Sequence, residues 1–401
     1  MDLFKKLNDF ILTITSRNEN FWEQRKLGNL FNERKEKSTK GELLSVTLSN
    51  GVTKFSDLNK KDNSNIKSGN YKVVKKNDIP YNSMRMWQGA SGVSSYDGIV
   101  SPAYTVLVPN RNSNSNFYAV LFKKKSILNL FTRFSQGLTS DTWNLKYPIL
   151  KDIIVPFTNL EEQKRIFKIF NVINNLLALY DRKLKLLSQI KKYFLDNLFA
   201  KKEYPNLRFK GFTDAWEQRK LSSILIERKD LSTESKQFPL SSFIQEKGVV
   251  PKSQRYDRSF LVKDSSKKYK VTKFGDFIYS SNNLDTGSIG LNSYGNAVIS
   301  PVYSVFSSKN SNILETNFVN LLFQQNFYKN KMLRFRQGVM YGQLKIKEDD
   351  FLKVKVNVPS QIEIKNIINL FSKIESYATL LENKKKQLVQ IKNTLLNTMF
   401  I

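Results

Sequence analysis

Side chains that can recognise nucleic-acid bases are concentrated in a few short polar segments of this sequence. Amides and arginines can form paired hydrogen bonds with the edges of adenine and guanine, whereas lysines mainly neutralise phosphates. We predict as DNA-binding candidates Asn82, Ser83, Arg85, Trp87, Gln88, Arg133 and Gln136 in the first half of the chain, and Tyr279, Ser280, Asn282, Asn283, Arg334 and Gln337 in the second. For any one of them, an ordinary solvated loop residue is the alternative interpretation.

The charge balance points to the same kind of partner. The 401 residues include 65 Lys and Arg against 35 Asp and Glu, which gives a net charge of +30. A folded chain with so large a positive charge is expected to bind a polyanion, most simply nucleic acid. Hydrophobic residues make up 40% of the chain and charged residues 25%, which is typical of folded proteins.

Catalytic chemistry finds little support in the sequence. The chain has no His and no Cys, so Ser-His-Asp and Cys-His triads, zinc fingers and disulfides are excluded. It contains no Gly-Lys dipeptide and no GxGxxG, which phosphate-binding and dinucleotide-binding loops require. We therefore predict no catalytic residue, no metal site and no cofactor in this chain.

Two short motifs could still suggest an enzyme. The segment Asn77–Tyr81 is similar to an adenine-methylating motif, but it lacks the two adjacent prolines, and we interpret Asp78 as the entry to a strand. The acidic run Glu348-Asp349-Asp350 could imitate a nuclease metal site. It lies just before an apolar strand and has no equivalent in the first half, so we interpret it as a solvated turn.

The chain is an internal duplication. The string Trp-Glu-Gln-Arg-Lys-Leu begins at Trp22 and recurs unchanged from Trp216. Further pairs of similar strings follow in the same order in both halves. They are residues 78–83 and 276–281, Ser101–Tyr104 and Ser300–Tyr303, Arg133–Gly137 and Arg334–Gly338, and Gln189–Lys191 and Gln390–Lys392. Two copies are too few for a solenoid, and they indicate a pseudo-twofold pair instead.

Each half begins with a region that predicts a mixed α/β globule. Short apolar runs such as Tyr104–Val108 and Val354–Val358 read as strands bounded by turn residues. Each half then ends in a long helix. Asn159 and Ser360 are each followed three residues later by a glutamate, the pattern of a capping box at a helix start.

The two predicted helices each carry an apolar seam with alternating steps of three and four residues, typical of a coiled coil. The seam residues that we predict to form the helix-pair and partner interface are Ile173, Leu177, Leu184 and Leu187 in the first helix, and Ile374, Leu381 and Leu388 in the second. Lys385 interrupts the second seam, and an isolated polar seam residue often fixes the register. Two separate amphipathic helices, each packed on its own globule, are the alternative.

These elements predict an α+β fold in which two similar mixed α/β domains are joined by a pair of long antiparallel coiled-coil helices with pseudo-twofold symmetry. The predicted boundaries are an N-terminal extension at 1–21, a first domain at 22–156, a central helix at 157–203, a second domain at 204–359 and a final helix at 360–401.

Two stretches resemble a known family. The run Leu207–Glu217, LRFKGFTDAWE, resembles the inter-domain segment of specificity subunits of Type I restriction-modification systems. The stretch Tyr81–Ala90 is similar to one of their target-recognition domains. The order domain, helix, domain, helix also matches. The Leu-Arg-Phe-x-Gly-Phe run precedes Trp216 but not Trp22, so the resemblance does not extend to residues 1–21.

The resemblance implies that each target-recognition domain reads one half of a bipartite sequence in double-stranded DNA. It implies that the helices set the spacer and dock two adenine-N6 methyltransferase subunits, and that the assembly can recruit ATP-driven restriction subunits. S-adenosylmethionine, ATP and Mg²⁺ would then be bound by the partner subunits, and this chain would be non-catalytic.

Three other functions would leave different signs in the sequence. A stand-alone sequence-specific DNA-binding protein predicts little exposed apolar surface on the helices. A nuclease or methyltransferase is opposed by the missing motifs. An RNA-binding protein would need aromatics exposed on a sheet, whereas most aromatics here fall on apolar strands or helix seams. No apolar run approaches the roughly 18 residues of a membrane span, so we expect a cytoplasmic protein.

Overall fold

The computed structural model describes residues 22–58, 61, 66, 69–244, 248–252, 267–280, 288–338 and 345–400. The chain divides into two compact units. The first unit comprises Met1–Asp181 together with Glu382–Ile401, and the second comprises Arg182–Leu381. Each unit contains one globule and a part of each long helix. Because this division cuts both helices, the domain boundaries expected from the sequence stay a prediction.

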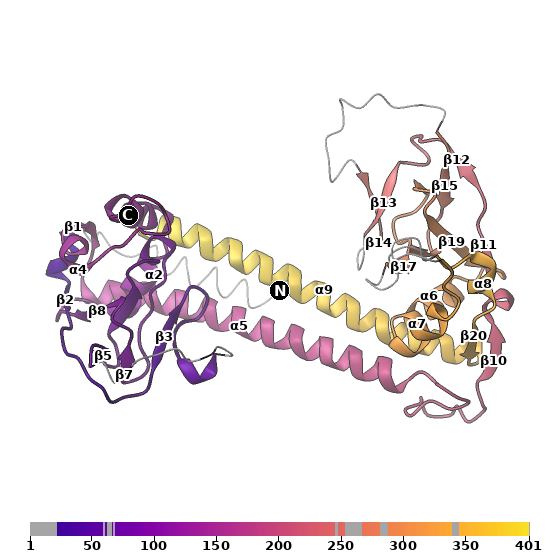
Figure 1. The fold of residues 1–401 in the computed structure, drawn as a ribbon, viewed down its shortest axis with the longest axis horizontal. Coiled ribbons are helices and arrows are strands. Elements are labelled where there is room, and N and C mark those ends of the chain that lie inside the picture. Colours follow the sequence, from indigo (N-terminus) through magenta and orange to yellow (C-terminus); the bar gives the residue numbers. More distant parts are fainter. Residues whose placement is uncertain are drawn as a thin grey trace. The chain divides into compact units, whose positions relative to one another are not determined.

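The first globule is built from short antiparallel strands and short helices (Figure 1). Its strands are β1 Glu23–Lys26, β2 Phe31–Glu33, β3 Leu44–Thr47, β4 Gly51–Lys54, β5 Lys72–Val74, β6 Ile79–Asn82, β7 Gly98–Val100, β8 Tyr104–Pro109 and β9 Ile154–Phe157. Its helices are α2 Ser115–Leu121, α3 Lys125–Phe134 and α4 Tyr147–Leu150, with the 3-10 turns η1 Leu27–Asn29, η2 Phe55–Asp57 and η4 Met86–Gln88. The strands pair in the orders β2-β8-β6, β3-β4, β5-β7 and β1-β9.

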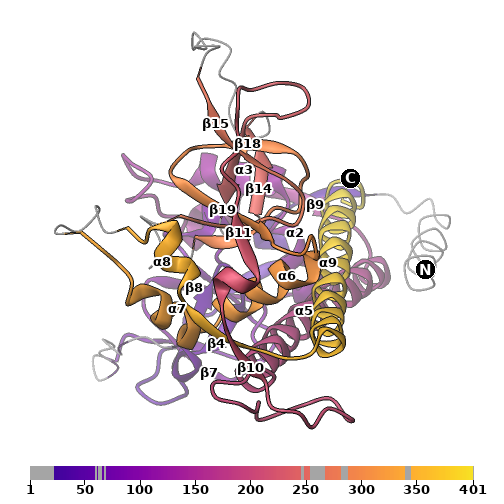
Figure 2. The same cartoon turned by 90° about the vertical axis from the view of Figure 1, so that its right-hand side faces the viewer.

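The second globule repeats this plan (Figure 2). Its strands are β10 Glu217–Lys220, β11 Leu225–Glu227, β12 Leu231–Ser232, β13 Ser241–Ile244, β14 Gly248–Pro251, β15 Tyr269–Thr272, β16 Phe277–Ser280, β17 Ile289–Leu291, β18 Ala297–Ile299, β19 Tyr303–Ser308 and β20 Lys355–Val358. Its helices are α6 Ile313–Phe323, α7 Asn326–Leu333 and α8 Glu348–Leu352, and its 3-10 turn is η5 Leu221–Ser223. The order β11-β19-β16 corresponds to β2-β8-β6.

The repeated string Trp-Glu-Gln-Arg-Lys-Leu closes each globule. Its Glu-Gln-Arg-Lys part forms β1 and β10, which pair antiparallel with the last strands, β9 and β20. The leucine that follows, Leu27 or Leu221, is fully buried, and its N–H donates to the carbonyl of Ile153 or Val354. The string therefore joins the start of each globule to the strand that leads into a long helix.

The two long helices are confirmed close to their predicted starts. They are α5 Leu160–Asn197 and α9 Gln361–Thr398, each 38 residues long. The side-chain oxygens of Asn159 and Ser360 accept hydrogen bonds from the backbone N–H groups of Glu162 and Glu363, at 2.9 and 3.3 Å. The carboxylate of Glu363 binds the Arg208 guanidinium through bonds of 2.9 and 2.8 Å, so it serves a tertiary contact at this helix start.

Within each unit, the helices run antiparallel. In the first unit the Phe170 ring lies 5.8 Å from the Phe400 ring, and Lys385 forms an ion pair with Asp181. In the second unit the Phe371 ring lies 6.0 Å from the Phe199 ring, and Lys191 pairs with Glu375 at 2.9 Å. The predicted interface residues Ile173, Leu177, Leu184, Leu187, Ile374, Leu381 and Leu388 are all buried or partly buried.

Each globule is completed by the end of the other half's helix. In the first unit, Phe400 packs against Trp22 and Phe117, with ring centroids 6.4 and 5.2 Å apart. In the second unit, Phe199 packs in the same way against Trp216 and Phe318, at 6.4 and 5.7 Å. Figure 1 accordingly shows the C-terminus beside β1 and α2. The repeated tryptophan and the repeated terminal phenylalanine therefore belong to one buried aromatic cluster in each unit.

Among the described residues, no helix is both long enough and apolar enough to cross a membrane.

Candidate nucleic-acid interface

A buried arginine–aspartate pair holds the same strand entry in both globules. In the second globule, Arg228 donates two hydrogen bonds to Asp276, at 2.8 and 2.9 Å, and in the first, Arg34 donates to Asp78 at 2.7 and 3.0 Å. The two carboxylate side chains are only 3% exposed. The hydrogen bonds to the aspartates raise the pKa of both guanidinium groups above their ordinary value. The interpretation of Asp78 as a strand entry is therefore confirmed.

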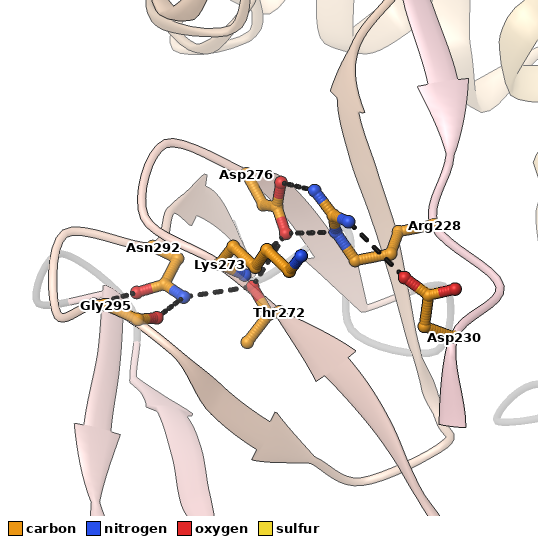
Figure 3. A network of polar contacts seen from close by, with 7 residues as sticks. All are labelled: Arg228, Asp230, Thr272, Lys273, Asp276, Asn292 and Gly295. Atoms are coloured by element: carbon orange, nitrogen blue, oxygen red, sulfur yellow. Dashed lines mark hydrogen bonds and ion pairs between the residues drawn. The ribbon is translucent and has the colours of Figure 1, made fainter. Parts of the chain in front are cut away.

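The surrounding polar contacts position the turns on either side of this pair (Figure 3). The backbone N–H of Lys273 and the Thr272 hydroxyl both donate to Asp276, at 2.7 and 3.3 Å. Asn292 links this group to a second turn, because its amide donates to Thr272 and to the Gly295 carbonyl, at 3.1 and 2.7 Å. The framework thus fixes where β16 begins and where the loop before β18 lies.

Three of the predicted DNA-binding residues belong to this buried framework. Tyr279 is fully buried in β16, and its hydroxyl donates to the Ile346 carbonyl at 3.2 Å. Tyr81 donates to the Leu145 carbonyl in the same way, and burial raises the pKa of both phenols. Ser83 shares a 2.9 Å hydrogen bond with Thr105, and Ser280 is 3% exposed. Tyr279, Ser83 and Ser280 are therefore not available to DNA in this structure, which corrects the expectation for them.

The other candidates of the first globule lie at the end of β6 and just after it, and at the end of α3 and just after it. Asn82 uses its side-chain carbonyl to accept from the Met84 N–H at 3.0 Å, and Arg85 is exposed and donates to Gln88 at 3.5 Å. Trp87 lies in η4, which packs against α3, the helix that carries Arg133 near its end. Arg133 and Gln136 are exposed. The structure thus places Trp87 and Gln88, directly after Arg85, against α3.

The Arg133–Gly137 string and its copy begin two loops that are closed in the same way. Gln136 and Asn144 exchange two backbone hydrogen bonds of 3.0 and 2.8 Å, and Gln337 and Lys345 exchange two of 2.8 Å each. Arg334 is exposed, whereas the amide of Gln337 donates to Asp350 at 2.8 Å. Asn282 and Asn283 lie outside the described residues.

Sequence reasoning missed two aromatic and apolar side chains in the loop of the first globule. The indole of Trp143 meets that of Trp87 edge to face, with ring centroids 5.2 Å apart. Leu138 is fully exposed. The only sequence signal for either residue was its position just after the repeated Arg-Phe-x-Gln-Gly string, where the two halves of the chain stop resembling each other.

The acidic run Glu348-Asp349-Asp350 is not a solvated turn, as the sequence suggested, but the first turn of α8. Acidic residues are favourable there because they face the positive end of the helix dipole. Glu348 accepts from Lys270 at 3.2 Å and from the Ser304 hydroxyl at 2.9 Å. Among the described residues, no group of His, Cys, Asp or Glu side chains is arranged to hold a metal ion.

Comparison with known proteins identifies the class to which this architecture belongs. Residues 19–189 match the Type I restriction modification DNA specificity domain. The specificity subunit of the Type I restriction enzyme MjaVIII of Methanocaldococcus jannaschii is 24% identical over 351 residues, which cover 81% of this chain and 78% of the relative.

Solved structures share the fold along almost the whole chain. The S subunit of a Type I restriction-modification system from M. genitalium matches with a TM-score of 0.58 at 14% identity, covering 96% of this chain and 97% of that one. A chain from a structural study of the assembly and conformational transition of the Type I system matches with a TM-score of 0.52 at 13% identity, covering 95% and 97%.

The duplicated fold and these matches define a DNA-specificity protein, which confirms the resemblance seen in the sequence. Residues 19–189 match the Type I restriction modification DNA specificity domain, and over most of its length the chain is similar to a specificity subunit of a Type I restriction enzyme. Subunits of this class are non-catalytic, and the methyltransferase is a separate subunit of the complex.

Proposed function

We propose that each globule of this specificity subunit reads one half of a bipartite target in double-stranded DNA. One observation carries the proposal: the two globules share a buried framework and the same loop closure, but they present different loop sequences. The first loop reads Gln-Gly-Leu-Thr-Ser-Asp-Thr-Trp-Asn from Gln136, and the second reads Gln-Gly-Val-Met-Tyr-Gly-Gln-Leu-Lys from Gln337. Two readers of different half-sites on one frame would have this composition.

The proposed DNA contacts are the candidates that are not buried in the framework, together with two that lie outside the described residues. In the first globule they are Arg85, Trp87, Gln88, Arg133 and Gln136, with Asn82 at the end of β6, and in the second they are Arg334 and Gln337 together with Asn282 and Asn283. The arginines suit guanine edges and phosphates, and the amides suit adenine. With a net charge of +30, binding should weaken steeply as salt is raised, because phosphate contacts release counterions.

We further propose that the helices set the spacer between the half-sites and dock two methyltransferase subunits. Large apolar side chains remain exposed on both helices within each unit. In the first unit they are Val172, Leu179 and Val389, and in the second they are Leu186, Tyr193, Ile362, Tyr377 and Leu380. Along α5, Val172, Leu179, Leu186 and Tyr193 recur every seven residues, a spacing that keeps them on one face of a helix.

This exposed surface favours partner subunits over a stand-alone DNA-binding protein, which needs no apolar helix face. Exposed apolar surface of this kind commonly marks a protein interface. In the proposed complex, S-adenosylmethionine, ATP and Mg²⁺ are bound by the methyltransferase and restriction subunits, and the complex works in the cytoplasm.

The test is a map of N6-methyladenine in a genome that expresses this chain with a compatible methyltransferase subunit. We expect methylation within a split motif, in which two short defined halves flank a gap of fixed length. A continuous motif would contradict the two-reader arrangement, and an absence of methylation would contradict the assignment of the partner.

A further inference from the structure

The loop of residues 136–144, here called the first reading loop, is held in shape by its own backbone. Beyond the two hydrogen bonds between Gln136 and Asn144, the N–H groups of Thr142 and Trp143 donate to the Thr139 carbonyl at 2.9 and 3.1 Å. Gly137 has a φ of +142°, and a Cβ there would lie 2.6 Å from the Thr142 carbonyl oxygen. The tip is therefore preorganised before any ligand arrives.

The tip presents an apolar side chain to solvent. Leu138 has a relative exposure of 101%, higher than that of any other large apolar residue in the described part of the chain, where Ile362 follows with 69%. Residues 137–142 lie between the two residues that close the loop, and all of them are exposed. When a ligand covers an apolar side chain on a stiff loop, the burial of that side chain contributes favourably to the free energy of binding.

The composition of the loop does not fit contact with phosphates. The chain has 65 Lys and Arg, yet residues 136–144 include neither, and they carry the carboxylate of Asp141. A carboxylate is repelled by phosphates, and the donors it can meet on DNA bases in the major groove are the amino groups of cytosine and adenine. Leu138 and Asp141 are therefore both suited to groups on the edges of bases, an apolar group for Leu138 and an amino group for Asp141.

Two arginines adjoin the first reading loop, one along the sequence and one through the ring contact of η4. Arg133 lies three residues before its start, and Arg85 precedes η4, whose Trp87 is in ring contact with Trp143 of the loop. Basic residues that bind phosphates fix the register of a protein on DNA, and the groups between them read the bases. The loop that carries Leu138 and Asp141 therefore adjoins two arginines that can bind phosphates.

We propose that the first reading loop enters the major groove of one half-site, where Leu138 contacts the C5-methyl group of a thymine and Asp141 accepts a hydrogen bond from the amino group of a cytosine or adenine. The thymine methyl group is exposed only in the major groove, which favours this reading over a wedge inserted from the minor groove. The inference rests on the proposed function and assigns specificity-determining residues to one of its two readers.

The first test removes the methyl group from the DNA. The assembled complex of this chain with its methyltransferase subunits is bound to duplexes that carry the mapped target, with deoxyuridine replacing each thymine in turn. One position in one half-site should weaken binding about three- to fivefold, the effect of losing roughly one buried methyl contact. The Leu138→Ser complex should bind the thymine duplex about as weakly and should not respond to deoxyuridine at that position.

Ile154→Ser supplies the matched control. Ile154 is also an exposed apolar residue of the first unit, at 51%, but it lies in β9, so its variant should keep the full response to deoxyuridine. The proposal is overturned if no thymine position matters. It is also overturned if Leu138→Ser lowers the affinities for the thymine and deoxyuridine duplexes by the same factor, and so stays as sensitive to deoxyuridine as the wild type, as a wedge would.

The second test reads base preference directly. In the methylation map, Asp141→Asn should relax or change the preference at one position of one half-site and leave the other half-site intact. An unchanged motif overturns the role of Asp141. The proposed function is tested separately, by whether the wild-type chain gives a split motif. A failure of the proposed function can therefore be distinguished from a failure of this inference.

Discussion

The buried arginine–aspartate pairs of the two globules correspond bond for bond, whereas the reading loops correspond only at the closure. Arg34 and Asp78 form the same two-pronged pair as Arg228 and Asp276. The loops that start at Gln136 and Gln337 share a glutamine, a glycine and a two-bond backbone closure, and then their sequences diverge. The residues kept in both copies hold the backbone in place, and the differing residues Leu138 to Thr142 of the first copy are exposed on it.

A second comparison concerns the ends of the long helices. Phe400 and Phe199 fill equivalent aromatic clusters, but each enters the globule that the other half of the chain builds. Neither globule can complete its core with residues from its own repeat alone. The duplication is thus a structural requirement of each unit as well as a way to obtain two readers.

The largest expected effect breaks the shared framework. Asp276→Ala removes the two-pronged partner of Arg228, whose side chain is only 16% exposed, and leaves the exposed Asp230 at 3.5 Å as the remaining ion-pair partner of the guanidinium. Removing one partner of a buried ion pair costs about 3–5 kcal/mol of the free energy of unfolding. Asp78→Ala should cost the first unit a similar amount, because Arg34 is 17% exposed. Denaturant unfolding combined with hydrogen exchange of each unit measures both losses.

The control for this prediction is Glu217→Gln. It breaks the ion pair of Glu217 with Arg219 on the surface, where both side chains are well exposed, and exposed pairs add little stability. This variant should unfold like the wild type. A large loss for Asp276→Ala together with none for Asp78→Ala would contradict the equivalence of the two pairs.

A smaller effect should distinguish the copies by pH. Burial lowers the pKa of Lys123 from 10.5 to about 8, and its ammonium donates hydrogen bonds to the carbonyls of Gly89 and Ser91. The matching residue of the second copy is the exposed Gln324. Since the folded state holds the proton of Lys123 less tightly than the unfolded state, the free energy of unfolding should rise as pH increases above about 8.

The rise is limited to about 3–4 kcal/mol, because the pKa of Lys123 is lowered from 10.5 to about 8 and one pKa unit corresponds to about 1.4 kcal/mol. It is measured as the difference between the wild type and Lys123→Gln, which copies the second half, in denaturant unfolding from pH 7.5 to 9.5. The free energy of unfolding should rise less steeply with pH in the variant than in the wild type. Equal slopes would contradict the assignment to Lys123.

Much of this fold was predictable because its strongest signals are periodic or repeated. The 38-residue helices were visible from their seams and caps, and the duplication was visible from strings such as Trp-Glu-Gln-Arg-Lys-Leu. The sequence could not show which globule Phe199 and Phe400 complete, because that depends on tertiary packing at a long sequence separation. It did not reveal the arginine–aspartate pairs either, because their partners lie 44 and 48 residues apart.

The candidate site was predicted less well, for a physical reason. Every residue of β16 is buried, so this strand lacks the alternation that separates inward from outward side chains. Tyr279 and Ser280 therefore looked like loop residues available to a ligand. Ser83 was misread in the same way, because its hydrogen bond to Thr105 joins residues distant in the sequence. Leu138 was missed because a lone leucine carries no sign of its exposure.

The central claim is that the two globules read separate half-sites from one framework. The most direct test exchanges residues 22–156 for the corresponding domain of another specificity subunit and maps N6-methyladenine in cells that also express the methyltransferase subunit. One half of the split motif should change, while the other half and the length of the gap stay the same. A change in both halves, or in neither, would contradict the account.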